Sequence, residues 1–126
     1  MVQNEHFIHK DLTYKVIGCA MEVHRELGYG FLEKVYENAL MVQLKKEGVE
    51  AKQQQGVSVQ FAGETVGEYF ADILIEDKII VERKAVDSLI KPHFAQVLNY
   101  LKATNIKMGL LLNFGPQGLQ HKRFIY

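Results

Sequence analysis

Apolar residues recur at helical spacing in three stretches of the chain. Residues 11–27 and 31–47 carry them three and four positions apart, which predicts two helices separated by a turn at Gly28–Gly30. The third stretch opens at Pro92 and ends near Thr104. The predicted inner faces comprise Ile17, Ala20, Met21, His24 and Leu27 in the first helix, Leu32, Val35, Tyr36, Ala39, Leu40 and Leu44 in the second, and Phe94, Val97, Leu98 and Leu101 in the third.

The spacing changes from helical to alternating in the middle of the chain. Apolar and polar residues alternate from Val57 to Phe61, and turn residues separate this segment from two further apolar segments. A later run of almost wholly apolar residues is typical of a strand covered on both faces. Strands are therefore predicted over residues 57–61, 66–76, 79–86 and 108–113.

The order of these elements predicts an α/β fold built on a central mixed four-stranded sheet flanked by helices. The last strand follows a helical crossover, so we expect it to lie parallel to a central strand. Residues 117–126 indicate either a final helical turn or an edge segment. A chain of 126 residues is long enough for one well-buried core, which predicts a single domain over residues 1–126.

Composition and charge exclude some classes of protein. Fifteen basic and fifteen acidic residues balance, which argues against a protein that coats nucleic acid through a strong global field but leaves local contacts open. No apolar run approaches the roughly 20 residues of a membrane span. Cys19 is the single cysteine and no signal peptide is recognisable, so we expect a cytoplasmic protein without an internal disulfide.

Three charged residues lie in the most apolar hairpin of the chain. Asp72 precedes the run Ile73–Ile75, while Glu82 and Lys84 follow the run Ile79–Val81. Buried strands rarely carry ions unless the ions are paired or hold a metal. These three charges therefore need either a partner or a function.

The register of the hairpin determines whether the charges meet. A three-residue loop would pair Ile75 with Ile79 and place Asp72 opposite Glu82, with Lys84 two residues further along the same face. A two-residue loop would instead divide the charges between the two faces. The sequence alone leaves both registers open, and we favour the first because it gathers the charges.

Two carboxylates at adjacent strand positions repel each other unless a positive charge lies between them. Mg²⁺ prefers oxygen ligands and keeps several waters, and the backbone carbonyl of Arg83 would be a further ligand. Lys84 would then orient or deprotonate a metal-bound water for attack on a phosphodiester. The alternative is a structural network of Asp72, Glu82 and Lys84 at a sheet edge.

Further residues strengthen the metal hypothesis because they match a family pattern. Gly30, Glu33 and Tyr36 spell G-x-x-E-x-x-Y, and Gln96 and Tyr100 lie four residues apart on one helix face. Together with the hairpin, they resemble the PD-(D/E)XK nuclease superfamily, in particular its small "GxxExxY" proteins. The resemblance runs from about Val23 to Gly115 and includes Leu27-Gly28, Asp72, Glu82-Arg83-Lys84, Gln96 to Tyr100 and Gly109 to Gly115.

The resemblance implies a restriction-endonuclease-like α-β-β-β-α-β core with an extra N-terminal helix. It also implies that Asp72 and Glu82 bind Mg²⁺ or Mn²⁺, that Lys84 assists the water, and that Glu33 supports the metal site. Gln96 and Tyr100 would line the active site and the nucleic-acid path, as in RecB-like and lambda-exonuclease-like nucleases.

The chain departs from the family pattern at two positions. Ala71 replaces the proline of the family name, and Arg83 fills a position that is often apolar, where it would reach a phosphate or face solvent. The expected function is metal-dependent hydrolysis of DNA phosphodiesters. The alternatives are a non-catalytic nucleic-acid-binding or interaction module of the same fold, and an enzyme that works as a homodimer or needs a partner subunit.

Overall fold

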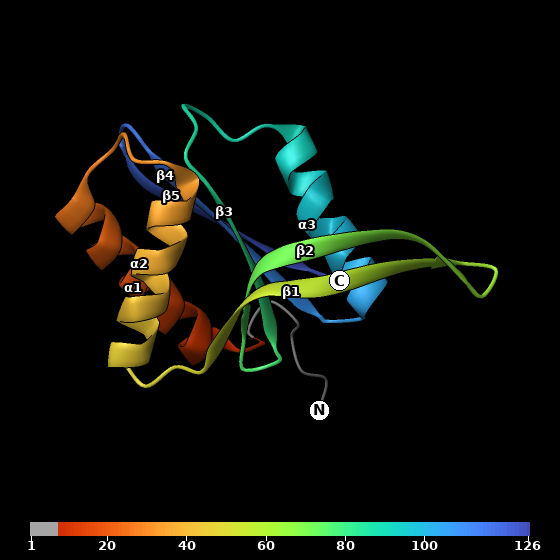
Figure 1. The fold of residues 1–126 in the computed structure, drawn as a ribbon. Helices are drawn as coiled ribbons and strands as arrows, with labels where there is room; N and C mark the ends of the chain where they lie inside the picture. The colour runs from red at the N-terminus through yellow and green to blue at the C-terminus, as the bar shows by residue number, and fades with distance from the viewer. Residues whose placement is uncertain (1–7) are drawn as a thin grey trace.

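The alternating and helical stretches of the sequence fold into one mixed sheet with helices on both faces (Figure 1). The computed structural model describes residues 8–126. The elements are α1 (Lys10–Leu27), α2 (Glu33–Lys46), β1 (Ala51–Phe61), β2 (Glu64–Ile75), β3 (Ile79–Lys84), α3 (Lys91–Thr104), β4 (Met108–Gly115) and β5 (Gly118–Ile125). Among these residues, no helix is both long and apolar enough to cross a membrane.

The sheet has five strands in the order β1-β2-β3-β4-β5, so the predicted count of four is wrong. The prediction that the strand after the crossover is parallel to a central strand is confirmed, because β4 pairs with β3 in parallel. Residues 118–125 form the additional strand, which pairs with β4 through a tight turn between Gly115 and Gly118. The middle of β5, residues 120–123, is exposed and polar without alternation, which is why its strand character is hidden in the sequence.

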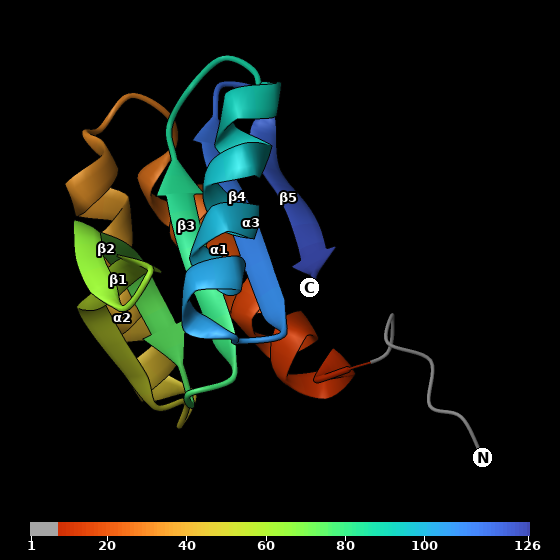
Figure 2. The same cartoon turned by 90° about the vertical axis from the view of Figure 1, so that its right-hand side faces the viewer.

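The helices pack on both faces of the sheet (Figure 2). One apolar cluster joins α1 and α2 to β3 through Ile79 and Val81, and a second joins α3 to β3 through Ile80. Consecutive side chains of β3 therefore pack on opposite faces of the sheet, as expected for a pleated strand. At Gly109 of β4, an added Cβ would lie 2.5 Å from Cγ1 of Val97, so glycine is what allows α3 to approach this closely.

The helices turn their inner faces somewhat differently from the prediction. Four residues that were predicted to face inward are exposed: Met21, Leu32, Val35 and Leu98. The buried positions of α1 are Thr13, Val16, Cys19, Ala20 and Val23. These side chains are small or β-branched and let the helix lie close to its neighbours. Hydrophobicity alone therefore does not predict which positions of the helix are buried.

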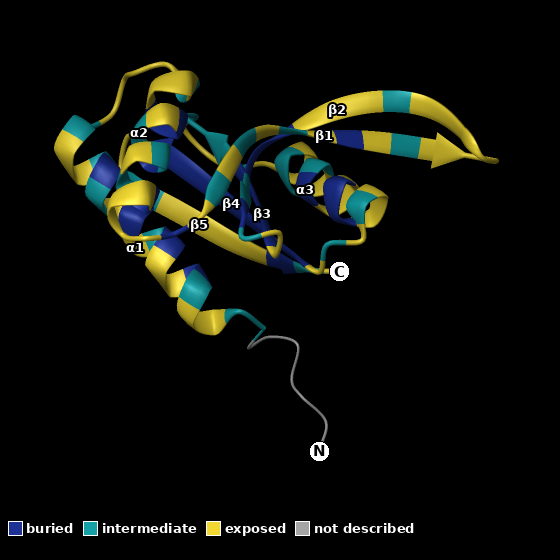
Figure 3. Ribbon diagram, turned by 60° about the horizontal axis from the view of Figure 1, so that its bottom comes forward, coloured by how far each residue is buried: buried dark blue, intermediate teal, exposed yellow. Residues whose placement is uncertain are grey.

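The first two strands continue beyond the rest of the sheet as a two-stranded arm. β2 pairs with β3 only from Ile73 to Ile75, whereas its pairing with β1 runs from Phe61 and Glu64 at the turn down to Ala51 and Ile75. We call residues 55–71 the arm. It extends past α3 and is largely exposed (Figures 1 and 3).

Candidate active site

The three-residue loop of the hairpin is confirmed. Ile75 pairs with Ile79 and Ile73 with Val81, so continuing the register places Asp72 opposite Glu82. The loop closes with a hydrogen bond of 2.8 Å from the Lys78 N–H to the Ile75 carbonyl. Its first two residues adopt left-handed backbone angles, with φ values of 48° and 58°. This conformation turns the chain within three residues.

Asp72 lies where β2 separates from β3. Regular pairing stops at Ile73, and the carboxylate Oδ2 of Asp72 accepts the Arg83 backbone N–H at 2.9 Å. The side chain thereby replaces the strand carbonyl that would otherwise satisfy this donor. Asp72 is 8% exposed, so the carboxylate is held at the edge of the core and not in bulk water.

Glu82 is the more deeply buried acid, with 3% of its surface exposed. Within residues 8–126 its buried Oε1 has no hydrogen-bond partner. Its pKa is raised to about 10, chiefly by burial and also by hydrogen bonding to the Asp72 carboxyl and by the negative charge of Asp72, while nearby Lys84 acts in the opposite direction. Lys84 does not offset the burial and the negative charge of Asp72, so at neutral pH the acid pair must hold a proton or a cation.

The donors around this pair suit a hard divalent ion. The Asp72 and Glu82 carboxylates and the Arg83 carbonyl offer oxygen atoms as metal ligands. Among them, Oε1 of Glu82 has no hydrogen-bond partner within the described residues and is free to bind an ion. Within the described part of the chain, no group of three or more His, Cys, Asp and Glu side chains is arranged to hold a metal. A bound Mg²⁺ or Mn²⁺ would thus have two carboxylates, a backbone carbonyl and water molecules as its ligands. Mg²⁺ commonly keeps several water ligands in proteins, so this set is suitable for it.

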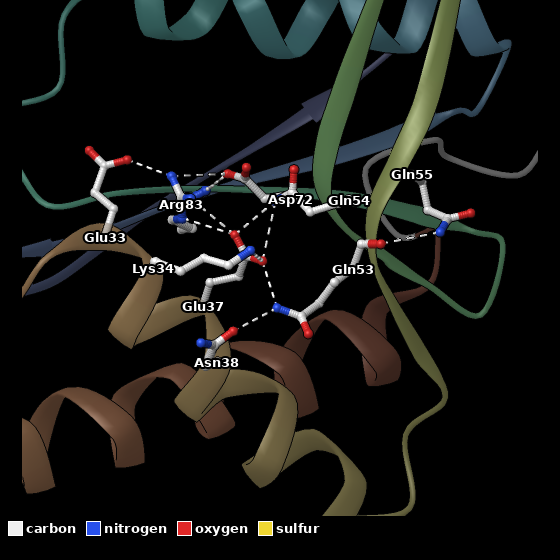
Figure 4. Close-up of polar contacts among 9 residues, drawn as sticks. All are labelled: Glu33, Lys34, Glu37, Asn38, Gln53, Gln54, Gln55, Asp72 and Arg83. Atoms are coloured by element: carbon white, nitrogen blue, oxygen red, sulfur yellow. Dashed lines mark hydrogen bonds and ion pairs between the residues drawn. The ribbon is translucent and has the colours of Figure 1, made fainter.

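Glu33 contacts Arg83 instead of the acid pair. The Arg83 guanidinium points toward α2, where Nη1 binds Glu33 Oε1 at 2.5 Å, and it lies 3.8 Å from Asp72 Oδ2 on the other side. Figure 4 shows Arg83 between these two acids. Only 16% of the Arg83 side chain is exposed, so the expectation that it faces solvent is wrong. Its donors are occupied by carboxylates.

Glu37, which no motif of the sequence singles out, is fully buried at the centre of this network. Arg83 Nη2 and Gln53 Nε2 reach its carboxylate at 3.0 and 2.6 Å, and Gln54 and Lys34 also donate to it (Figure 4). Burial acts to raise the Glu37 pKa, but these donors outweigh it and the pKa is lowered. Glu37 is therefore a charged group inside the protein, fully supplied with hydrogen-bond donors.

A signal for this network was present in the sequence. Glu33 and Glu37 are four residues apart on one helix, and like charges at that spacing repel each other unless a cation lies between them. Gln53 to Gln55 form an uninterrupted polar run at the start of β1, where alternation would be expected. Both features indicate a charged partner close to α2 and β1, and the structure shows that this partner is Arg83.

The other two residues of the G-x-x-E-x-x-Y pattern shape the loop before α2. The Tyr36 hydroxyl donates to the Gly28 carbonyl at 2.5 Å and accepts the Phe31 N–H at 3.2 Å. Gly30 adopts a φ of 118°, which favours glycine. Gly30 and the buried Tyr36 thus hold the turn that delivers Glu33 to Arg83.

The opposite face of the sheet brings α3 to the acid pair. Gln96 Nε2 donates to the Tyr100 hydroxyl at 3.2 Å, and both residues line a cavity of about 460 Å³. Burial raises the Tyr100 pKa, and the nearby charges of Glu82 and Asp72 raise it further although Gln96 acts against them. Lys84 lies on the same face as Glu82, because side chains two residues apart on a strand point the same way. The structure thus brings together five predicted site residues: Asp72, Glu82, Lys84, Gln96 and Tyr100.

Comparison with known proteins agrees with this architecture. A family model described as the PD-(D/E)XK nuclease superfamily matches residues 10–124. A search of curated proteins gave no match. A solved structure described as "Crystal structure of SSO0001" is similar, with a TM-score of 0.56 and 19% sequence identity over 73% of this chain and 50% of that chain. This chain thus matches about half the length of that structure, and the likeness concerns the fold.

The mixed sheet with helices on both faces is consistent with a restriction-endonuclease-like fold, as expected. The family match extends from the start of α1 to residue 124 in β5 and includes every element of the candidate site. The chain therefore belongs to the PD-(D/E)XK nuclease superfamily.

Proposed function

We propose that this chain is a nuclease that depends on Mg²⁺ or Mn²⁺ and hydrolyses phosphodiester bonds of DNA. The observation that carries the proposal is the buried pair of Asp72 and Glu82, with one carboxylate oxygen unpartnered among the described residues. Proteins of this superfamily are generally nucleases and typically use divalent metals. A buried acid pair with an unpartnered oxygen, next to a basic residue, is suited to holding a metal ion for such chemistry.

Each residue of the site has a proposed role. Asp72, Glu82 and the Arg83 carbonyl would hold the metal, which when bound supplies a Lewis acid that activates water and offsets negative charge. The Lys84 ammonium would orient the attacking water and take part in its deprotonation. Gln96 would hold the substrate strand beside the acid pair.

Tyr100 and Glu33 would act around this centre. The Tyr100 hydroxyl, held by Gln96, would contact the nucleic acid at the entrance to the site. Glu33 would support the metal site indirectly, since it binds the Arg83 guanidinium that lies beside Asp72. We further propose that the chain is one of the small "GxxExxY" proteins, because Gly30 and Tyr36 build the turn that presents Glu33.

A second function is favoured by one observation. Within the described residues no third acid joins Asp72 and Glu82, and Glu33 is occupied by Arg83. A non-catalytic module that retains the nuclease fold would bind DNA with a strong dependence on salt and without turnover.

The test combines metal binding with cleavage. We expect calorimetric titration with Mn²⁺ to give binding that Asp72→Asn and Glu82→Gln abolish, and labelled DNA to be cut by the wild type with Mn²⁺. Asp77→Asn is the matched control, because this exposed acid lies in the loop at the far end of the same hairpin. Absence of both Mn²⁺ binding and cleavage of single- and double-stranded DNA would contradict the proposal.

A further inference from the structure

A groove between the arm and α3 leads away from the candidate active site. Two adjoining cavities of about 460 and 550 Å³ form it, and both fall in the range of roughly 300–1,000 Å³ that is usual for ligand sites. Tyr69 and Asn99 line both cavities. The inner cavity also contacts Gln96 and Tyr100, whereas the outer one is lined by Val59, Gln60, Lys102 and Ala103. We call this feature the arm groove.

Tyr69 offers an aromatic surface in the middle of the arm groove. It is 52% exposed, and its ring lies 6.0 Å from that of Tyr100, centroid to centroid. Tyr100 is itself only 7% exposed and lies near the acid pair. Tyr69 and Asp72 belong to the same strand, three positions apart. Tyr69 thus connects the outer part of the arm groove to Tyr100 and, through it, to the region of the acid pair.

The α3 side of the arm groove supplies polar groups at helical spacing. Gln96, Asn99 and Lys102 follow one another every three residues, so they lie along one side of the helix. Within residues 8–126, neither the Asn99 amide nor the Lys102 ammonium has a hydrogen bond or ion pair through its side chain. Both groups are available to a ligand.

We propose that the arm groove binds single-stranded nucleic acid, with a base on Tyr69, a phosphate at Lys102 and base edges at Asn99. This inference rests on the proposed nuclease function and adds its substrate class. Grooves that combine a basic group with exposed aromatic rings are typical of single-strand binding, since every base has a face that can stack.

The charges of the arm argue against a duplex as the occupant. Proteins that read a duplex insert a helix or a strand pair into a groove and neutralise phosphates with basic residues. Residues 55–71 contain no Lys or Arg, and they include the acids Glu64 and Glu68. The arm is therefore poorly suited to enter a duplex groove.

Binding can be measured apart from cleavage. We expect fluorescence anisotropy in EDTA to show tighter binding of a labelled oligothymidylate than of a blunt hairpin duplex of similar length. Tyr69→Ala should weaken the single-strand affinity at least about fivefold, and Tyr69→Phe should restore it, because stacking needs the ring and not the hydroxyl. Lys102→Ala should lower the salt slope by about 0.7, the value for one phosphate contact.

Phe70→Ala is the matched control, because Phe70 is the neighbouring aromatic residue, is 60% exposed and does not line the arm groove. Unchanged circular dichroism would show that the Tyr69 variants are folded. Equal or tighter binding of the duplex, or equal losses in Tyr69→Ala and Phe70→Ala, would overturn the inference.

A cleavage assay separates this inference from the proposed function. Single-strand binding that depends on Tyr69, without cleavage by the wild type in Mn²⁺, would support the arm groove and refute the nuclease. Cleavage of duplex DNA that Tyr69→Ala leaves unchanged would support the nuclease and refute the arm groove. An oligouridylate probe reports whether the sugar matters, and tight binding of either single strand supports the inference.

Discussion

Glu82→Gln is expected to stabilise the metal-free protein at neutral pH. Glu82 is 3% exposed, and its pKa is raised from 4.5 to about 10, chiefly by burial and by the Asp72 carboxyl. Below about pH 4.5 the carboxyl is protonated in the folded and the unfolded chain, so it costs no stability. As the pH rises, the unfolded chain releases its proton while the folded chain retains it, and stability falls until about pH 10.

The size of the effect follows from the distance between pH 7 and the ordinary pKa. Since pH 7 lies 2.5 units above the ordinary pKa of 4.5 and each unit corresponds to about 1.4 kcal/mol, keeping Glu82 buried costs the folded protein about 3 kcal/mol at pH 7. Glutamine has a similar shape and does not ionise, and therefore avoids this penalty. The gain in the free energy of unfolding should approach 3 kcal/mol at pH 7 and vanish near pH 4.

Urea unfolding followed by circular dichroism in EDTA would measure this difference at both pH values. Asp77→Asn, in the exposed loop of the same hairpin, should show no comparable change with pH. In Mn²⁺ the wild type should gain stability through binding, whereas Glu82→Gln should gain little. The reasoning would be refuted if Glu82→Gln lowered stability at pH 7 in EDTA, because Glu82 would then be a satisfied structural acid.

Three further predictions concern the two faces of the sheet. Glu37→Ala should lower the free energy of unfolding by about 3–5 kcal/mol, because it leaves the largely buried Arg83 without its main partner. Glu26→Ala, at an exposed position, should change the free energy of unfolding little, and equal effects of the two variants in urea unfolding would contradict this prediction. Gly109→Ala should cost about 1–3 kcal/mol because its Cβ would collide with α3, and an unchanged midpoint in thermal unfolding would argue against this packing. Lys84→Met should retain Mn²⁺ binding and folding but lose cleavage; if cleavage persisted, Lys84 would have no role in activating water.

The helical and alternating spacings were sufficient to locate most elements from the sequence. There are two main exceptions: β5, which the sequence left open as either a helical turn or an edge segment, and β1, which begins at Ala51 and not at Val57. Its first residues include the polar run Gln53 to Gln55, which lacks alternation because two of these glutamines donate to the buried Glu37. Periodicity reports the burial of apolar side chains, and it fails where a strand turns polar side chains toward a buried charge.

The sequence by itself determined the local features of the fold, which depend on residues that are close together along the chain. Two apolar runs and a short loop reduced the hairpin to two possible registers, and the structure shows the one that places Asp72 opposite Glu82. The tertiary structure alone decided which acids meet which base. Glu33 and Glu37 bind Arg83 from one face of β3, while Glu82 and Lys84 face α3 on the other. Such pairing depends on how α2 crosses the sheet, and residues almost fifty positions apart carry no mutual signal in a single sequence.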